Sequence, residues 1–209
     1  MKISASTGKR NKIHVSIDGE YAYTVDAEYW YSCPYRDKSE IEGPEEIERF
    51  KHDVGSRSAF ISGLNILSYG DNSRKALGRK LVSKGFCKEY VEAALDRLEE
   101  YGYVNDERYA QNLAQKLLDS KHMSPGAIKQ ELMLKGVDRE TADAAAGELE
   151  TDPHEQIMTL LCGKYSRYLH DEKGIKKTVA ALKRLGYGWS DIKNALEEAQ
   201  ADTEDEFID

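Results

Sequence analysis

The sequence predicts a mainly α-helical protein: tandem three-helix repeats in an elongated curved array, with a small β-hairpin region at the N-terminus. Three observations support this prediction. Residues 13–25 alternate apolar and polar side chains around an Asp-Gly turn. Residues 44–64 carry apolar side chains at helical spacing. From residue 73 onward the sequence aligns with itself, with repeated features about fifty residues apart.

The composition agrees with a folded, water-exposed protein. The chain has 209 residues, of which 40% are hydrophobic and 33% are charged, and its net charge is −8. It contains no apolar run long enough for a membrane span and no signal-peptide pattern, which predicts a cytoplasmic location without a membrane. The three cysteines Cys33, Cys87 and Cys162 are far apart, so we expect reduced thiols rather than disulfides or a zinc site.

The first element is a hairpin around Asp18-Gly19. A two-residue loop would place the tyrosines of the second strand on the wrong face. An odd-length loop with glycine in the left-handed region would set Ile13 and Val15 opposite Tyr23 and Tyr21, and we favour this register.

One hairpin is not stable alone in water, so it must pack on a further strand near Ile3 or on the helices that follow. Four aromatic residues follow the hairpin, namely Tyr29, Trp30, Tyr31 and Tyr35. We interpret them as an aromatic cap over a small core; the alternative is a platform for stacking bases.

The next element is a long helix that begins at Pro44. Proline suits a first helical turn, and the glutamates that follow it favour the helix dipole. Apolar residues at three-, four- and seven-residue spacing extend from Ile47 to Leu64, with Gly55-Ser56 as a potential bend.

The repeat is defined by a glycine that ends a helix. Gly85, Gly136 and Gly186 each follow a leucine by four residues and precede an apolar residue, which indicates a left-handed C-terminal cap. Second helices are predicted to start near residues 87, 138 and 188. Further helices are predicted after Asn105 and at Asp152-Pro153, and the second copy opens at Ser124-Pro125.

These signals divide the chain into four predicted segments. They are the hairpin region 1–42, the long helix with a first three-helix repeat 43–121, a second three-helix repeat 122–170, and a third, incomplete repeat with an acidic tail 171–209. Stacked repeats favour broad binding surfaces over enclosed pockets.

No motif for catalysis is recognisable. Thr7-Gly8-Lys9 lacks the first glycine and the hydroxyl residue of a phosphate-binding loop, and the five histidines lack metal-ligand spacing. We therefore predict no catalytic residue, no metal, no cofactor and no enzymatic activity. Residues 134–141 resemble the turn of a helix-turn-helix, but the helix that would read DNA carries mostly acidic residues.

Two stretches resemble a known family. Residues 98–110, Leu-Glu-Glu-Tyr-Gly-Tyr-Val-Asn-Asp-Glu-Arg-Tyr-Ala, are similar to the central signature of RecX proteins, and residues 128–137 are similar to the second conserved run of that family. The resemblance covers nearly the whole chain. It implies a regulator, chiefly an inhibitor, that lies in the groove of the RecA–DNA filament and blocks strand exchange, coprotease activity and filament growth in DNA repair and the SOS response.

The expected interface consists of basic residues. Net charge is locally positive between Arg74 and Lys84 and between Lys164 and Arg184. The predicted interface residues are Arg79, Lys80, Lys84, Lys129, Lys135, Lys176, Lys177, Lys183 and Arg184. The family-motif residues, for which a structural role is expected, are Gly102, Tyr103, Asn105, Asp106, Tyr109 and Gly136.

The expected partner is the RecA nucleoprotein filament, with direct DNA contact secondary and the protein itself a monomer. Two alternatives remain open: a helical module that binds nucleic acid by itself, and a passive scaffold for another protein.

Overall fold

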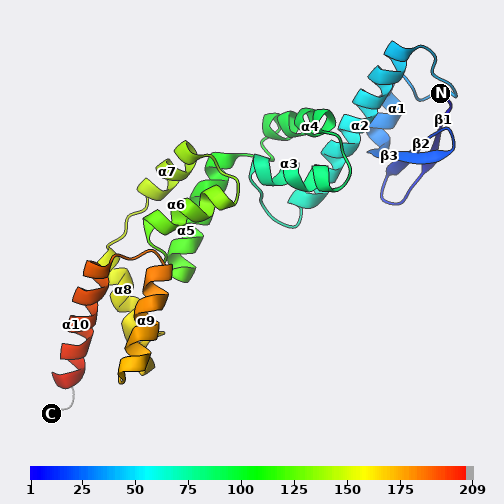
Figure 1. Cartoon of the computed structure of the whole chain (residues 1–209). Helices are drawn as coiled ribbons and strands as arrows, with labels where there is room; N and C mark the ends of the chain where they lie inside the picture. The colour runs from blue at the N-terminus through cyan, green and yellow to red at the C-terminus, as the bar shows by residue number, and fades with distance from the viewer. Residues whose placement is uncertain (206–209) are drawn as a thin grey trace. The chain divides into compact units, whose positions relative to one another are not determined.

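The computed structural model describes the backbone of residues 1–205 and the side chains of residues 1–200. Figure 1 shows three strands followed by helices. The strands are β1 (Ile3–Thr7), β2 (Lys12–Ile17) and β3 (Glu20–Asp26). The helices are α1 (Ala27–Ser32), α2 (Pro44–Leu67), α3 (Arg74–Ser83), α4 (Lys88–Glu100), α5 (Asp106–Lys121), α6 (Pro125–Leu134), α7 (Arg139–Gly147), α8 (Pro153–Cys162), the 3₁₀ turn η1 (Ser166–Tyr168), α9 (Glu172–Arg184) and α10 (Trp189–Asp205).

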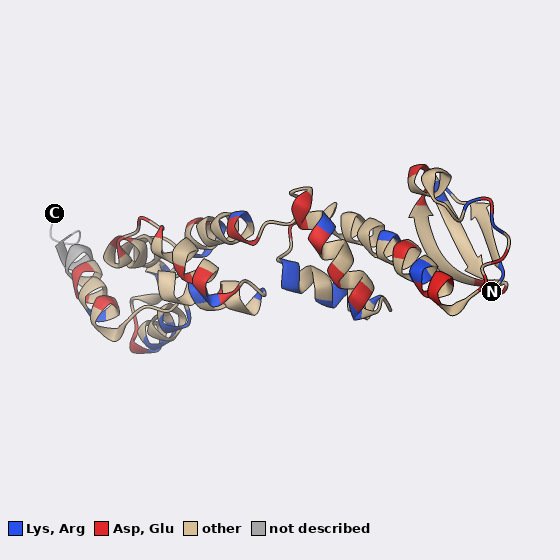
Figure 2. Ribbon diagram, turned by 90° about the horizontal axis from the view of Figure 1, so that it is seen from above, with Lys and Arg blue, Asp and Glu red and all other residues tan. Residues whose placement is uncertain are grey.

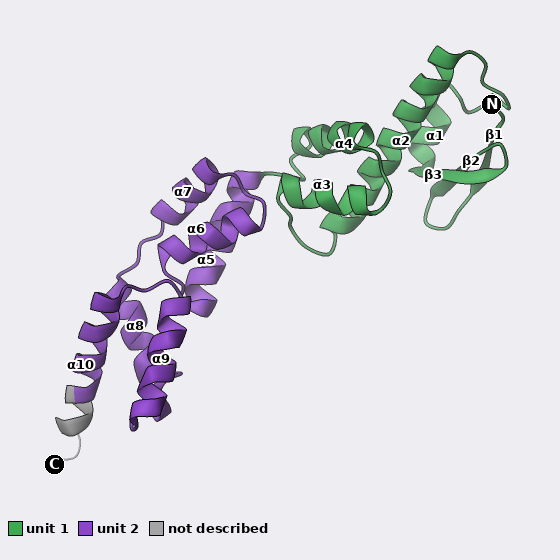
Figure 3. Ribbon diagram, viewed as in Figure 1, with its two compact units in different colours: residues 1–105 green, residues 106–209 purple. Residues whose placement is uncertain are grey.

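The chain forms two compact units, Met1–Asn105 and Asp106–Asp209 (Figure 3). The first contains the sheet and helices α1–α4, and the second contains helices α5–α10. The fold is therefore mainly helical with a small antiparallel sheet, as predicted. The end of the predicted acidic tail, residues 206–209, lies outside the described residues.

The N-terminal sheet has the strand order β1-β2-β3, so the segment near Ile3 supplies the expected third strand. The predicted hairpin register is wrong by two residues. Val15 pairs with Tyr23, and the predicted partner Tyr21 pairs with Ser16.

The error in register has a local cause. Asp18 and Gly19 form a two-residue turn with φ values of +50° and +90°, as in the turns that match the twist of paired strands. An irregularity between Val15 and Ser16 then shifts the pairing by one residue. This bulge, rather than an odd-length loop, determines which face of the sheet the tyrosine side chains of β3 occupy.

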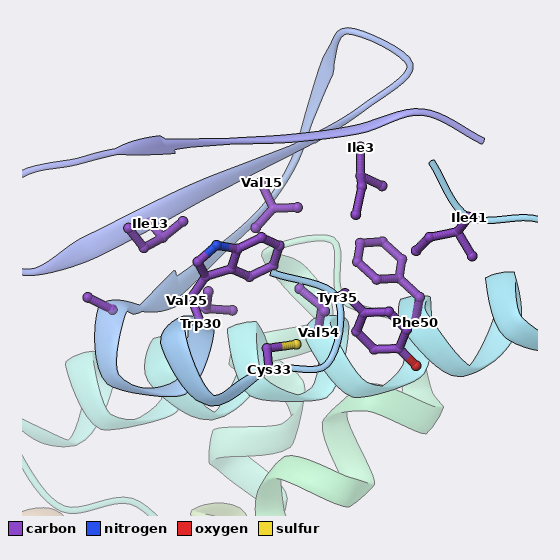
Figure 4. Packing of buried hydrophobic residues seen from close by; sticks show 11 residues of the cluster. Ile3, Ile13, Val15, Val25, Trp30, Cys33, Tyr35, Ile41, Phe50 and Val54 are labelled. Carbon is purple, nitrogen blue, oxygen red and sulfur yellow. The ribbon is translucent and has the colours of Figure 1, made fainter. Parts of the chain in front are cut away.

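The sheet covers a core that it shares with α1 and the first half of α2 (Figure 4). Trp30 and Tyr35 are buried in this core, which confirms the aromatic cap, whereas Tyr31 is exposed. The ring of Tyr35 meets that of Phe50 edge to face at 5.0 Å between centroids. Such a pair adds about 0.5–1.5 kcal/mol beyond the burial of apolar area.

Helix α2 contributes residues to two hydrophobic cores. Its first half, with Phe50 and Val54, packs under the sheet, and its second half, with Ala59 and Phe60, packs on α3 and α4. The helix continues through Gly55-Ser56, where a bend had been considered. A Cβ at Gly55 would lie 2.5 Å from the ring of Tyr90, so glycine allows α4 to approach closely.

Asp26 links the sheet to both neighbouring helices. Its carboxylate accepts the amide of Tyr29 at 2.9 Å, which caps α1, and accepts Arg57 Nε of α2 at 2.7 Å. Burial alone would raise the pKa of Asp26, but the hydrogen bonds from Arg57 and the Tyr29 amide outweigh it and hold the pKa below its usual value.

The lowered pKa of Asp26 predicts a pH-dependent stability. A carboxyl group with a depressed folded-state pKa stabilises the fold above its unfolded pKa of about 3.9, and this contribution is lost as pH falls through the folded value. We expect Asp26→Asn, which keeps a capping oxygen, to be less stable than wild type at neutral pH and to show a smaller loss of stability on acidification. Urea unfolding followed by Trp30 fluorescence in a Trp189→Phe background, between neutral pH and about pH 3, measures this difference. Parallel pH curves for the two proteins would contradict it.

The three glycine caps have the same geometry in all copies. The φ angles of Gly85, Gly136 and Gly186 are +95°, +96° and +93°. In each case the amide of the following residue bonds back to the leucine carbonyl five residues earlier, with N···O distances of 3.4, 3.1 and 3.3 Å. The three sequence repeats are therefore equivalent structural positions, as predicted.

The buried clusters divide the helices into groups whose limits differ from those of the predicted segments. The second half of α2 packs with α3 and α4, α5 with α6 and α7, and α8 with α9 and α10. In each group, the helix before the glycine-capped helix packs its apolar face against the two helices that follow it in the sequence. It thus completes the three-helix core. The third group is a full three-helix core, since α8 belongs to it.

Within residues 1–205, every helix is too short or too polar to span a lipid bilayer.

Candidate protein-interaction surface

The nine predicted interface residues lie on or at the end of the middle helix of each three-helix group, α3, α6 or α9. Each of these helices starts at a side-chain cap, from Ser73, Ser124 and Asp171 respectively. Each buries a leucine before its glycine cap. Eight of the nine residues are exposed and Lys129 is half-buried; Figure 2 colours the lysine and arginine positions of the ribbon in blue.

The structure separates paired from unpaired cations among these nine. Lys129 forms an ion pair with Asp143 of α7, Lys135 lies 3.8 Å from Glu131, and Lys176 lies 2.5 Å from Glu172. Lys80 Nζ donates to Asn72 Oδ1 at 2.5 Å. Within the described residues, no ion pair forms at the remaining cations, which are Arg79, Lys84, Lys177, Lys183 and Arg184. These five are the cations most available to a partner.

Arg74 has an internal role. Its guanidinium binds Glu92, Asp96 and Glu99 of α4 at 2.8, 2.7 and 2.5 Å. Burial would lower the pKa of Arg74, but the hydrogen bonds to Asp96 and Glu92 raise it above the usual value. Arg74 therefore links α3 to α4 and partly offsets the negative charge of three carboxylates of α4.

Exposed apolar side chains accompany the cations at the C-terminal turns of α3 and α6. Val82 and Met133 occupy equivalent repeat positions and are 44% and 43% exposed, and Leu134 is 74% exposed. Sequence reasoning missed these residues because their spacing also fits a buried helix face. At α3 the exposed apolar side chain lies beside cations without an ion pair among the described residues, which is typical of a protein-binding surface rather than of a solvated one.

The family-motif residues lie between α4 and α5. Gly102 has a φ of +71°, and the amides of Tyr103 and Val104 bond to the Leu98 carbonyl at 2.8 and 3.2 Å. Val104, and not Tyr103, enters the core: Val104 is 3% exposed, and the Tyr103 ring is 53% exposed and contacts Tyr101 edge to face.

The remaining motif residues lie at the start of α5 and at the second repeat glycine. Asp106 begins α5, and Tyr109 packs partly into the second three-helix core. Asn105 directly precedes α5, where a capping residue is expected, and Gly136 is buried in its cap. The structural role of the motif residues stays a prediction.

A cavity of about 650 Å³ between α5 and α7 is acidic. Its charged lining residues are Glu107, Asp138, Glu140 and Glu148. Helix α7, which borders this cavity, is the helix whose sequence resembles the reading helix of a helix-turn-helix. Its carboxylates oppose contact with phosphates. Among the described residues, no cluster of three or more His, Cys, Asp or Glu side chains is arranged to hold a metal ion.

Two segments match family profiles. Residues 59–98 match "RecX, first three-helix domain", and residues 105–145 match "RecX, second three-helix domain". These limits coincide with the first two three-helix groups defined by the buried clusters. Both segments are similar to the RecX family. Sequence and fold comparisons extend the match beyond the two profiles.

The regulatory protein RecX of Caldanaerobacter subterraneus subsp. tengcongensis is 29% identical over 188 residues, which cover 90% of this chain and 93% of that protein. The regulatory protein RecX of Clostridioides difficile is 29% identical over 198 residues, covering 93% and 92% of the two chains. A crystal structure of RecX from Lactobacillus salivarius superposes with a TM-score of 0.60 and 26% identity, over 70% of this chain and 97% of that one.

Another crystal structure, of a regulatory protein RecX, has a TM-score of 0.64 at 22% identity and covers 94% of this chain and 98% of that one, which supports the fold. The relatives from Caldanaerobacter subterraneus and Clostridioides difficile are both regulatory proteins by name.

Proposed function

We propose that this protein regulates the RecA recombinase, chiefly as an inhibitor. It binds in the groove of the RecA–DNA filament, where it hinders strand exchange, coprotease activity and filament growth. It acts by occupying the groove and performs no chemistry of its own.

The repetition of the exposed surface supports this proposal. Among the described residues, the equivalent helices α3 and α9 present cations without an ion pair, and α3 and α6 add exposed apolar side chains. A filament of identical subunits offers the same binding site many times, so a protein with repeated surfaces can engage several subunits at once. Such linked contacts add affinity without any single strong contact.

The interface is tested by reversing the charge of three unpaired cations, two in the first compact unit and one in the second. We expect Arg79→Glu, Lys84→Glu and Lys183→Glu together to require about tenfold more protein than wild type for half-inhibition of RecA strand exchange. The physical reason is the loss of three attractive contacts and their replacement by repulsion from acidic groups of the partner. Strand exchange and the DNA-dependent ATPase of RecA are the measurements.

The matched control reverses Lys9, Lys116 and Lys121, which are exposed and lie off α3, α6 and α9. It changes the net charge equally and should inhibit like wild type. Equal loss in the two triple variants would sink the assignment of the surface to these helices. A folded wild-type protein without effect on either RecA activity would refute the function itself.

A further inference from the structure

The third three-helix group contains a basic cavity, and two of its cations, Lys177 and Arg184, also belong to the predicted RecA interface. The cavity has a volume of about 460 Å³ and lies between the end of α8, the turn η1 and one face of α9. It is lined by Lys164, Tyr165, Arg167, Tyr168, Lys177, Thr178, Ala180, Ala181 and Arg184. No acidic side chain lines it.

The cavity depends on a close approach of η1 to α9. Gly174, in the first turn of α9, has no side chain, and a Cβ there would lie 2.0 Å from the Tyr168 carbonyl oxygen. The turn itself is fixed by the Tyr165 and Tyr168 amides, which donate to the carbonyls of Leu160 and Tyr165 at 2.9 and 2.8 Å. Two alanines on the exposed side of α9, Ala180 and Ala181, leave the space open.

The polar groups in the cavity are all able to donate hydrogen bonds. Lys177 and Arg184 lie seven residues apart on α9, about 10 Å along the axis and on the same face. Arg167 and Lys164 stand over the rings of Tyr168 and Tyr165, at 4.9 and 5.4 Å from the centroids. None of these four cations forms an ion pair within the part of the chain that the structure describes.

Thr178 is a second, independent observation. Its side chain lines the cavity, the residue is only 1% exposed, and its hydroxyl has no hydrogen-bond partner among the described residues. A buried hydroxyl without a partner is costly, and native structures usually provide one. An oxygen-rich ligand in the cavity would supply it.

We propose that this cavity binds a nucleotide unit of a single-stranded nucleic acid. Lys177 and Arg184 hold phosphate oxygens, the Thr178 hydroxyl donates to one of them, and the base stacks on the exposed ring of Tyr168. The site does not depend on contact with RecA, and it gives this otherwise acidic protein a local contact with a strand.

A nucleotide fits the lining better than a carboxylate side chain does. An acidic peptide would use the cations but would leave the two tyrosine rings without a role. Cations combined with aromatic rings are the usual composition of single-strand binding sites, where bases stack and phosphates pair with Lys and Arg. The arginines Arg167 and Arg184 also suit the two-pronged recognition of phosphate.

The test is fluorescence anisotropy of a labelled oligothymidylate titrated with the full chain, without RecA, at several salt concentrations. We expect Lys177→Gln with Arg184→Gln to weaken binding about tenfold and to flatten the salt dependence by about one unit of slope. Lys173→Gln with Lys176→Gln is the matched control on the same helix, outside the cavity lining, and should bind like wild type.

Two further variants separate a nucleotide site from a general basic surface. Thr178→Val removes only the buried hydroxyl and should weaken binding several-fold without loss of folding, and Tyr168→Ala should weaken it about tenfold. Competition by thymidine triphosphate that is lost in the same variants would also support the site and assign it to free nucleotides.

Three outcomes would overturn the proposal: absence of binding at low salt, equal binding of labelled oligoglutamate, or equal losses in the cavity pair and the control pair. Inhibition of RecA is measured separately with the variants at Arg79, Lys84 and Lys183, which do not line the cavity.

Discussion

Replacing Gly186 with alanine is expected to lower the free energy of unfolding of the second unit by about 3 kcal/mol. Two costs combine. The φ of +93° strains any residue with a side chain. A Cβ at this position would also lie 2.3 Å from Ser124 Oγ and 2.6 Å from Ala127 Cβ, at the start of α6.

The contacts around Gly186 explain why this steric conflict cannot relax easily. The Ser124 amide donates to the Leu185 carbonyl at 2.9 Å, and the Tyr187 hydroxyl donates to the His122 carbonyl at 2.7 Å. Burial of Tyr187 raises its pKa to about 12, so it keeps this proton at neutral pH. The cap of α9 thus joins the second and third three-helix groups, and displacing it breaks both hydrogen bonds.

Gly85→Ala is the matched control for Gly186→Ala. Gly85 caps α3 with nearly the same φ, +95°, but a Cβ there would meet no atom within 4 Å. Only backbone strain remains, and we expect a loss of about 1–2 kcal/mol in the first unit. Urea unfolding followed by far-ultraviolet circular dichroism gives both values. Equal effects would show that the contact with α6 contributes nothing to stability.

Phe50→Ala is expected to destabilise the first unit by about 3–5 kcal/mol, the usual cost of removing a fully buried aromatic side chain. Phe50 is 0% exposed and packs against Tyr35 and Ile41 in the core beneath the sheet (Figure 4). Trp30 belongs to the same core and is buried, so its fluorescence, recorded in a Trp189→Phe background that removes the second tryptophan, reports the unfolding of this unit. The urea midpoint measured by Trp30 should fall.

The control for Phe50→Ala is Tyr31→Ala, which removes an aromatic ring that is 57% exposed. Its cost should stay below about 1 kcal/mol, since only the contact with Arg36 is lost. A Phe50 variant with the stability of wild type would mean that the sheet and α2 do not share one core.

The repeat glycines and helix caps were predictable because each is a local signal. Gly85, Gly136 and Gly186 lie where the pattern predicted, and the helices after Ser124 and Asp152 begin at those side chains. The hairpin register was not predictable, because the bulge after Val15 costs little locally and is decided by packing against α1 and α2. The grouping of helices into cores also depends on long-range packing, which the spacing of the repeats leaves open.

The positive charge of the candidate surface was predictable from the sequence, but the ion pairs that its cations form were not. The excess of basic residues between Lys164 and Arg184 is visible in the sequence, and it contains the cavity of the third group. The ion pair between Lys129 and Asp143 joins two helices, so only the structure shows that this cation is already used. Likewise, the burial of Thr178 and the approach of η1 to Gly174 require the folded chain.

The second unit has two cavities whose linings carry opposite charge. Its α5–α7 group has a cavity lined by four carboxylates, and its α8–α10 group has a cavity lined by four cations. A local patch of cations can turn a protein in the field of a polyanion before contact is made. The α9 face is therefore expected to arrive first at a DNA-bearing filament, and added salt should slow the encounter more than it hastens dissociation.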